Sequence, residues 1–207
     1  YRPRPALTLI ELTIALAITT TTAAVLAVLI NATAMGTTTQ QDGRRGLARL
    51  QPIKAQLGDA VGNARCILAA GSNYLVYWTG DQIGAVTPAN DAVNLSELRL
   101  LEVDPTTKTL SLYSTQWPAG YSNASILAAD QTYVADADWY AAAEAAKTSG
   151  FFSPTTISTG ITAMGVSLDS ATATSARLVS LNITYTDGVT TRSAIVGAGL
   201  QNPSAPW

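Results

Sequence analysis

The sequence contains no histidine and only one cysteine, Cys66, among its 207 residues. Without histidine the chain cannot form Ser-His-Asp triads, HExxH zinc sites or imidazole general bases. A single cysteine cannot form an internal disulfide, and we interpret Cys66 as a small buried side chain rather than a nucleophile. The sequence also lacks a phosphate-binding glycine loop and paired catalytic carboxylates. These absences argue against an enzyme, and no cofactor is expected.

Charge is also scarce, because charged residues make up 13% of the chain and the net charge is −2. A nearly neutral chain has no electrostatic basis for binding nucleic acid. Alanine, threonine and serine are abundant, which favours an extracellular surface over a cytosolic enzyme. The length allows one globular domain of about 150 residues beside an N-terminal segment.

The longest run with almost no charge lies near the N-terminus. Leu7–Ile30 reads LTLIELTIALAITTTTAAVLAVLI, and Glu11 is its only charged residue. As a helix this run would extend about 36 Å, which is enough to cross a bilayer core of about 30 Å. A carboxylate at membrane depth costs several kcal/mol unless it is paired, so Glu11 indicates a functional role.

The residues around Glu11 resemble the processing motif of type IV pilins and of type II secretion pseudopilins. Ala6 stands where the leader of that family ends, and Leu7-Thr8-Leu9-Ile10-Glu11 resembles the start of the mature chain, with leucine in place of the frequent phenylalanine. The resemblance implies cleavage between Ala6 and Leu7 by a prepilin peptidase. The alternative, a plain signal peptide or anchor, has a shorter apolar core and no embedded glutamate.

In the family that the chain resembles, the motif glutamate meets the N-terminal amine of a neighbouring subunit. For this sequence the resemblance implies that Glu11 pairs with the amine of Leu7. If Tyr1 is instead retained in the mature chain, Arg4 or Arg2 becomes the expected partner, because a guanidinium is always charged and binds carboxylates in bidentate fashion.

The resemblance implies an α+β, pilin-like fold in which a long N-terminal hydrophobic helix packs on an antiparallel β-sheet. Residues 1–6 are expected to be a leader remnant or N-terminal extension, and residues 7–35 a hydrophobic transmembrane or filament-core helix. Residues 36–63 form the soluble half of the helix, where apolar residues recur at helical spacing from Leu47 to Val61. Residues 64–207 form a globular head rich in antiparallel β-strands.

Turn signals predict two hairpins in the head. One turn lies at Asp104-Pro105-Thr106-Thr107-Lys108, and the other at Asp187-Gly188, each between β-rich segments. Ala135–Lys147 is predicted to be a helix that ends before Gly150. The Thr19–Thr22 run has two interpretations, a packed helix face or a weak point where the helix could melt on assembly.

The sequence suggests two kinds of site in the head. Oxygen-bearing residues after Gly80 resemble a calcium loop, although their spacing does not match an EF-hand; the candidates are Asp81, Asp91, Asn94 and Glu97. Asparagines in N-x-S/T sequons are possible glycosylation sites; they include Asn94, Asn123 and Asn182. Neither signal is specific in a chain this rich in serine and threonine.

We therefore expect a structural subunit of an extracellular, type IV pilus-like filament, assembled by packing of N-terminal helices. The expected partners are identical subunits, the inner membrane before assembly, the prepilin peptidase and an assembly platform. Two alternatives stay open. One is a pseudopilin of a type II secretion system, in a periplasmic pseudopilus. The other is a tip adhesin or binding module, which needs a pocket or an aromatic patch.

Overall fold

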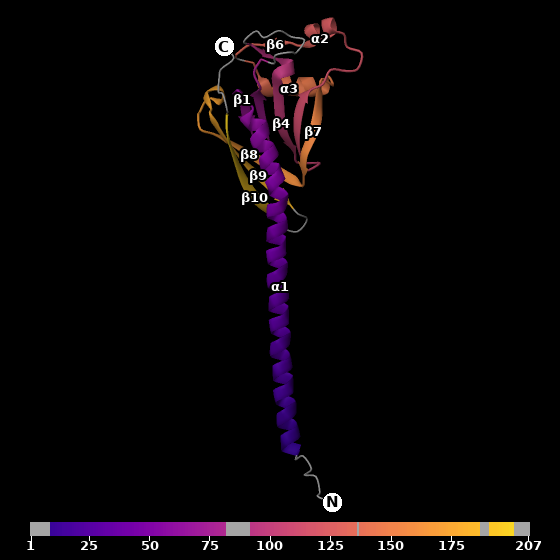
Figure 1. Cartoon of the computed structure of the whole chain (residues 1–207), viewed down its shortest axis with the longest axis vertical. Helices are drawn as coiled ribbons and strands as arrows, with labels where there is room; N and C mark the ends of the chain where they lie inside the picture. Colours follow the sequence, from indigo (N-terminus) through magenta and orange to yellow (C-terminus); the bar gives the residue numbers. More distant parts are fainter. Residues whose placement is uncertain (1–8, 82–91, 136, 187–190, 201–207) are drawn as a thin grey trace, which may run out of the picture. The chain divides into compact units, whose positions relative to one another are not determined.

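The computed structural model describes residues 9–81, 92–135, 137–186 and 191–200. The chain divides into two compact units, Tyr1–Arg49 and Leu50–Trp207. Helix α1 (Leu9–Gly62) begins in the first unit and ends in the second (Figure 1). The side chains of residues 11, 25, 29 and 31–49 of α1 are not described.

The expected pilin-like fold, a long hydrophobic helix packed on one antiparallel sheet, is wrong. The strands of the described residues lie in three separate antiparallel sheets, and apart from α1 the helices are short. Within those residues, no helix is both long enough and apolar enough to cross a membrane. The predicted transmembrane segment, residues 7–35, does not fit this finding. Helix α1 is not uniformly apolar, because it contains the Thr19–Thr22 run and many polar residues after Ile30.

The largest sheet has five antiparallel strands in the order β1-β2-β4-β5-β7. Its strands are β1 (Cys66–Gly71), β2 (Tyr74–Trp78), β4 (Leu98–Asp104), β5 (Thr109–Thr115) and β7 (Phe152–Thr159). The hairpin predicted at residues 104–108 is confirmed, because Asp104 pairs with Thr109 across the turn. The Asp104 carboxylate closes this turn by accepting hydrogen bonds from the Thr106 and Thr107 amides.

The second sheet has three strands in the order β10-β9-β8. They are β8 (Ile161–Leu168), β9 (Leu178–Thr186) and β10 (Thr191–Gly199), and β9 pairs with β10 antiparallel as the predicted hairpin requires. The Asp187-Gly188 turn itself lies outside the described residues. Gly160 separates β7 from β8 with a φ of 80°, a backbone region that favours glycine, so the chain turns there from one sheet into the next.

Smaller elements complete the head. A two-stranded sheet pairs β3 (Val93–Asn94) with β6 (Thr132–Tyr133). The helices are η1 (Leu95–Glu97), α2 (Asn123–Ala129), α3 (Trp139–Thr148) and η2 (Ala173–Ser175). Helix α3 was predicted from residue 135 but begins at Trp139, because the Asp138 side chain caps it by accepting a hydrogen bond from the Ala141 amide at 3.0 Å.

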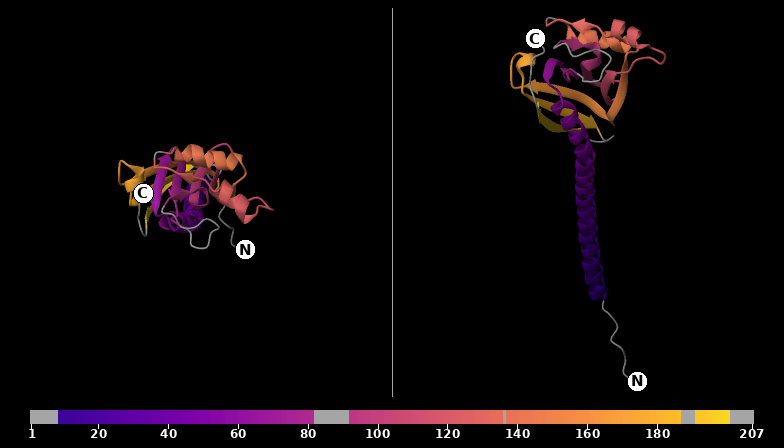
Figure 2. Two further views of the ribbon diagram at one scale, coloured as in Figure 1. Left: turned by 90° about the horizontal axis from the view of Figure 1, so that it is seen from above. Right: turned by 45° about the horizontal axis from the view of Figure 1, so that its top comes forward.

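Both faces of the five-stranded sheet are buried, and strand alternation assigns each side chain to one face. On one face Leu75 and Leu101 pack with the C-terminal end of α1, including Leu57, and with the three-stranded sheet. On the other face Val76 and Leu100 pack under α3 (Figure 2). The helical spacing of apolar residues predicted that the C-terminal end of α1 contributes one face to the core. The structure confirms this at four buried residues: Leu50, Ile53, Leu57 and Val61. Cys66 is buried as predicted, and burial raises the pKa of its thiol to about 11.

The β1–β2 turn joins both large sheets through Asn73, which has a φ of 70°. Its amide donates to the Met164 carbonyl at 2.9 Å, and its carbonyl accepts from the Val103 amide at 2.8 Å. Its side-chain oxygen accepts from the Met164 amide, also at 2.8 Å. Asparagine tolerates positive φ better than most residues and here also supplies the acceptor.

We expect Asn73→Ala to lower the free energy of unfolding by about 2–3 kcal/mol, because it adds backbone strain and leaves the Met164 amide without its acceptor. Asn73→Gly avoids the backbone strain but loses the same side-chain hydrogen bond, so it should cost about 1 kcal/mol. Urea denaturation followed by tryptophan fluorescence measures both values. Equal losses for the two variants would contradict the role assigned to positive φ.

Candidate functional site

The most unusual surface of the chain is the apolar part of α1, Leu9–Ile30, which we call the α1 segment. Nine of its large apolar side chains are between 54% and 81% exposed: Leu9, Ile10, Leu12, Ile14, Leu16, Ile18, Leu26, Val28 and Ile30. With 3.6 residues per turn, these positions point to every side of the helix. Large apolar side chains on every side of a helix are normally covered, so this segment calls for surroundings that cover all its sides.

The Thr19–Thr22 run satisfies its own hydroxyl groups inside α1. The hydroxyl of Thr21 donates to the Ala17 carbonyl at 2.9 Å, and that of Thr22 donates to the Ile18 carbonyl at 2.8 Å. Thr19 and Thr20 bond back in the same way. The helix is continuous through the run, so these residues need no hydrogen bonds from a neighbouring molecule. The weak-point hypothesis concerns the assembled state and stays a prediction.

The residues predicted for processing and pairing are mostly not described. Ala6, Leu7, Arg2 and Arg4 lie outside the described residues. Glu11 lies in the first turns of α1, but its side chain is not described. The roles proposed for these residues therefore stay predictions.

Two of the calcium candidates are brought together, and both are buried. Asn94 is 0% and Glu97 is 4% exposed. One carboxylate oxygen of Glu97, Oε2, accepts hydrogen bonds from the Trp78 indole at 2.9 Å and from the Asn94 amide at 3.2 Å. These bonds tie the carboxylate to the protein core. Asp81 lies just after β2, and Asp91 is outside the described residues; within the described part, no group of three metal-ligating side chains occurs.

A second buried carboxylate in this region was missed from the sequence. Asp130 is 5% exposed, and its two oxygens accept from the Ser96 amide and the Ser96 hydroxyl, both at 2.8 Å. Asn94 accepts from the Thr132 hydroxyl at 2.8 Å. The spacing from Asn94 to Glu97 is that of a capping box, which could have predicted the local structure. The partners Trp78 and Asp130 have no such local signal.

The three glycosylation candidates differ in accessibility. Asn123, at the start of α2, and Asn182, on β9, are exposed. Asn94 is fully buried, and its side-chain oxygen accepts a hydrogen bond. A glycan on Asn94 is therefore incompatible with this fold, whereas the other two positions can accept one.

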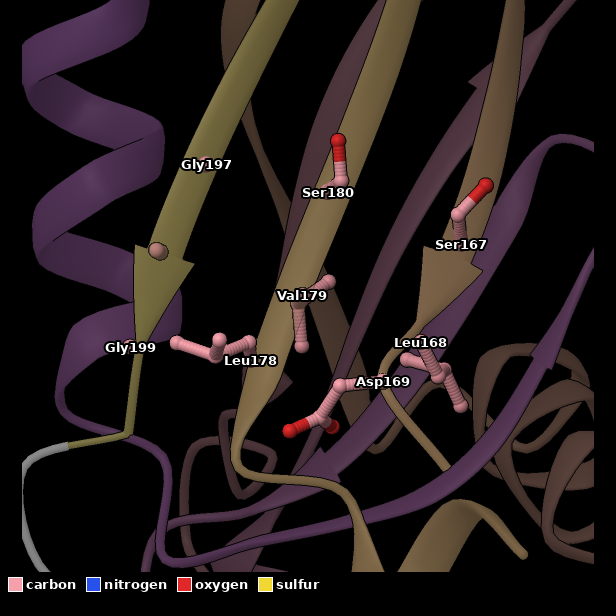
Figure 3. A pocket seen from close by; sticks show the side chains of 9 residues that line it. Ser167, Leu168, Asp169, Leu178, Val179, Ser180, Gly197 and Gly199 are labelled. Atoms are coloured by element: carbon pink, nitrogen blue, oxygen red, sulfur yellow. The ribbon is translucent and has the colours of Figure 1, made fainter. Parts of the chain in front are cut away.

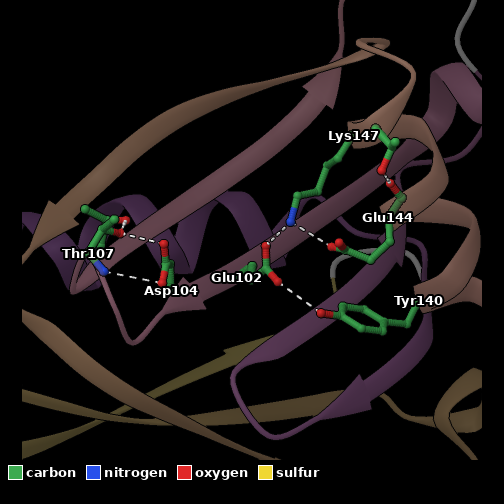
Figure 4. Close-up of polar contacts among 8 residues, drawn as sticks. Glu102, Asp104, Thr107, Tyr140, Glu144 and Lys147 are labelled. Atoms are coloured by element: carbon green, nitrogen blue, oxygen red, sulfur yellow. Dashed lines mark hydrogen bonds and ion pairs between the residues drawn. The ribbon is translucent and has the colours of Figure 1, made fainter.

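A polar cluster joins α3 to β4 (Figure 4). Lys147 forms ion pairs with Glu102 and Glu144, and Tyr140 donates to Glu102 at 3.0 Å. Burial lowers the pKa of Lys147, but the two carboxylates outweigh burial and raise it. Burial, together with the Glu102 charge, raises the pKa of the Tyr140 hydroxyl to about 12. Both shifts keep Lys147 charged and Tyr140 neutral, which suits a structural contact between α3 and β4 rather than acid–base chemistry.

A shallow cavity of about 510 Å³ lies on the three-stranded sheet (Figure 3). Gly197 and Gly199 help to form it by lacking side chains, and Leu178 beside them is 58% exposed. Among the described residues of its lining, the one ionisable group is Asp169, whose pKa is lowered by hydrogen bonds from the Leu178 and Arg177 backbone. The lining residues that the structure describes offer no arrangement of nucleophile and base.

Comparison of the chain with protein-family models, with curated proteins and with solved structures found no match.

Proposed function

We propose that the chain is a structural subunit of an extracellular, pilus-like filament, in which the α1 segments of identical subunits pack together. The observation that carries this proposal is the exposure of nine large apolar side chains on all sides of that segment. Burying one such side chain contributes about 1.5–3 kcal/mol, so covering several provides a large driving force for assembly.

The features of the α1 segment suit packing among several copies. A partner on one side would leave the other sides of the helix exposed, whereas a bundle of neighbouring helices covers all of them. The threonine hydroxyls are already bonded within α1 and can face an apolar neighbour without loss. The resemblance of the sequence around Glu11 to the pilin processing motif points in the same direction.

In the proposed packing, the pairing of Glu11 sets the offset of neighbouring helices along their axes. A carboxylate in an apolar bundle must be paired, and the proposed partner is the N-terminal amine of a neighbouring subunit or, if Tyr1 is retained, Arg2 or Arg4. Processing by a prepilin peptidase and polymerisation on an assembly platform belong to this proposal.

The proposal is tested by shearing filaments from cells that produce the chain and identifying the main protein by mass spectrometry. We expect this chain to dominate, and the same spectra show whether it begins at Leu7 or at Tyr1. Its absence from filaments, with retention in the periplasm, would favour a pseudopilus. Monomeric protein in every fraction would overturn assembly through α1.

A further inference from the structure

Aromatic side chains gather at the end of the head formed by α2, β6 and the C-terminal part of α3. Phe151 packs against Trp117 and Tyr121, with ring centres 5.4 and 6.1 Å apart. Tyr133 packs against Trp139 with a centre distance of 5.8 Å. These five rings form two contacting groups, and one ring from each group, Phe151 and Tyr133, lines the same cavity, so we call the five an aromatic cluster.

A cavity of about 150 Å³, which we call the aromatic pocket, opens within this cluster. Tyr133 and Phe151 are half-buried and line it, together with the buried side chain of Leu95. Gln131 and Ser149, which carry an amide and a hydroxyl, also belong to the lining and are exposed. The other described lining residues are alanines: Ala129, Ala145 and Ala146. Among the described residues, no charged side chain lines this pocket.

We propose that the aromatic pocket binds one neutral sugar ring, such as the end of a glycan. A sugar ring presents apolar C–H faces that pack on aromatic rings, and hydroxyl groups that bond to amides and hydroxyls. The pocket offers both kinds of group, and its volume suits a single ring rather than a larger ligand. Its uncharged lining favours a neutral ring over an anionic one.

The side chains of Gln131 and Ser149 are not used by the fold. The backbone amides of Gln131 and Ser149 are bonded to the Ala129 and Ala145 carbonyls. Within the described residues, however, their side chains have no hydrogen bond of their own. The pocket does not involve the α1 segment, so this inference stands or falls independently of the proposed function.

The test uses the full-length chain and a panel of methyl glycosides of glucose, galactose, mannose and N-acetylglucosamine. Saturation-transfer NMR detects binding, and tryptophan fluorescence reports it because Trp117 and Trp139 contact rings that line the pocket. We expect saturable binding of at least one glycoside. Saturable binding of none would overturn the proposal, as would tighter binding of a methyl glucuronide, which carries a negative charge.

Two substitutions on one helix locate the binding. Ala145 lines the pocket and is exposed, so Ala145→Leu should fill it and abolish binding. Ala141 is also exposed, lies one turn earlier on α3 and is outside the lining, so Ala141→Leu should bind like the unchanged chain. Near-UV circular dichroism confirms that both variants fold. Unchanged binding by folded Ala145→Leu would overturn the proposal.

A second pair of variants tests the polar contacts. Gln131→Ala combined with Ser149→Ala should raise the dissociation constant about 10-fold, because two hydrogen bonds to the sugar are lost. Gln56→Ala combined with Thr148→Ala removes an exposed amide and a hydroxyl outside the pocket and should leave the constant unchanged. Equal effects of the two double variants would contradict this assignment.

Discussion

In the filament that we propose, replacing Ile18 with aspartate is expected to abolish assembly and leave a folded, monomeric chain. Ile18 is 58% exposed on the α1 segment, so the head does not need it for folding. In a packed bundle of helices the new carboxylate would be buried without a partner, at a cost of several kcal/mol per subunit. Negative-stain electron microscopy of sheared fractions, with size-exclusion chromatography of the purified chain, measures the result.

The matched control is Ile195→Asp. Ile195 is 66% exposed on β10, in the other compact unit. The substitution therefore introduces the same charge at an isoleucine of similar exposure. We expect filaments from this variant to be as abundant as those from the unchanged chain. If Ile18→Asp also forms normal filaments, assembly does not depend on the α1 segment.

The largest expected loss of stability comes from Glu97→Ala. The substitution removes the oxygen that accepts from the Trp78 indole and from the Asn94 amide, so two buried donors lose this acceptor. An unpaired buried donor costs about 1–3 kcal/mol, so the free energy of unfolding should fall by about 2–5 kcal/mol. Thermal unfolding followed by near-UV circular dichroism, which reports the surroundings of Trp78, measures the loss.

Two further variants separate the hydrogen bonds from the charge. Glu97→Gln should cost much less than Glu97→Ala, because both donors bond to a single oxygen and an amide oxygen can replace it. Glu144→Ala removes a carboxylate that is 39% exposed and paired with Lys147, and it should cost about 1 kcal/mol or less. If Glu97→Gln were as damaging as Glu97→Ala, the charge of Glu97 rather than its acceptor role would hold this region.

Local sequence signals predicted much of the head. The Asp104–Lys108 turn and the β9–β10 pairing follow from residues adjacent in the chain, whose geometry depends little on distant contacts. The helical spacing from Leu50 to Val61 predicted the buried face at the end of α1. The apolar α1 segment was likewise visible as a run of residues. Each of these signals is local, which is why the sequence sufficed.

The number and arrangement of the sheets depend instead on contacts between residues far apart in the chain. Gly160 moves the chain from one sheet to another, and Asn73 binds Met164 across 91 positions, which no local pattern specifies. The expectation of a single sheet failed for this reason.

The candidate sites also divide into those visible in the sequence and those formed only by the tertiary structure. The sequence by itself determined that the chain has no histidine chemistry, no internal disulfide and one long apolar segment interrupted by Glu11. Only the tertiary structure decided that Glu97 is a buried acceptor for Trp78, because their side chains meet only after β2 and η1 pack together. Only the tertiary structure likewise formed the aromatic pocket, whose lining comes from residues 95 to 151. A pocket needs side chains from several elements at once, and their convergence is fixed by packing rather than by sequence spacing.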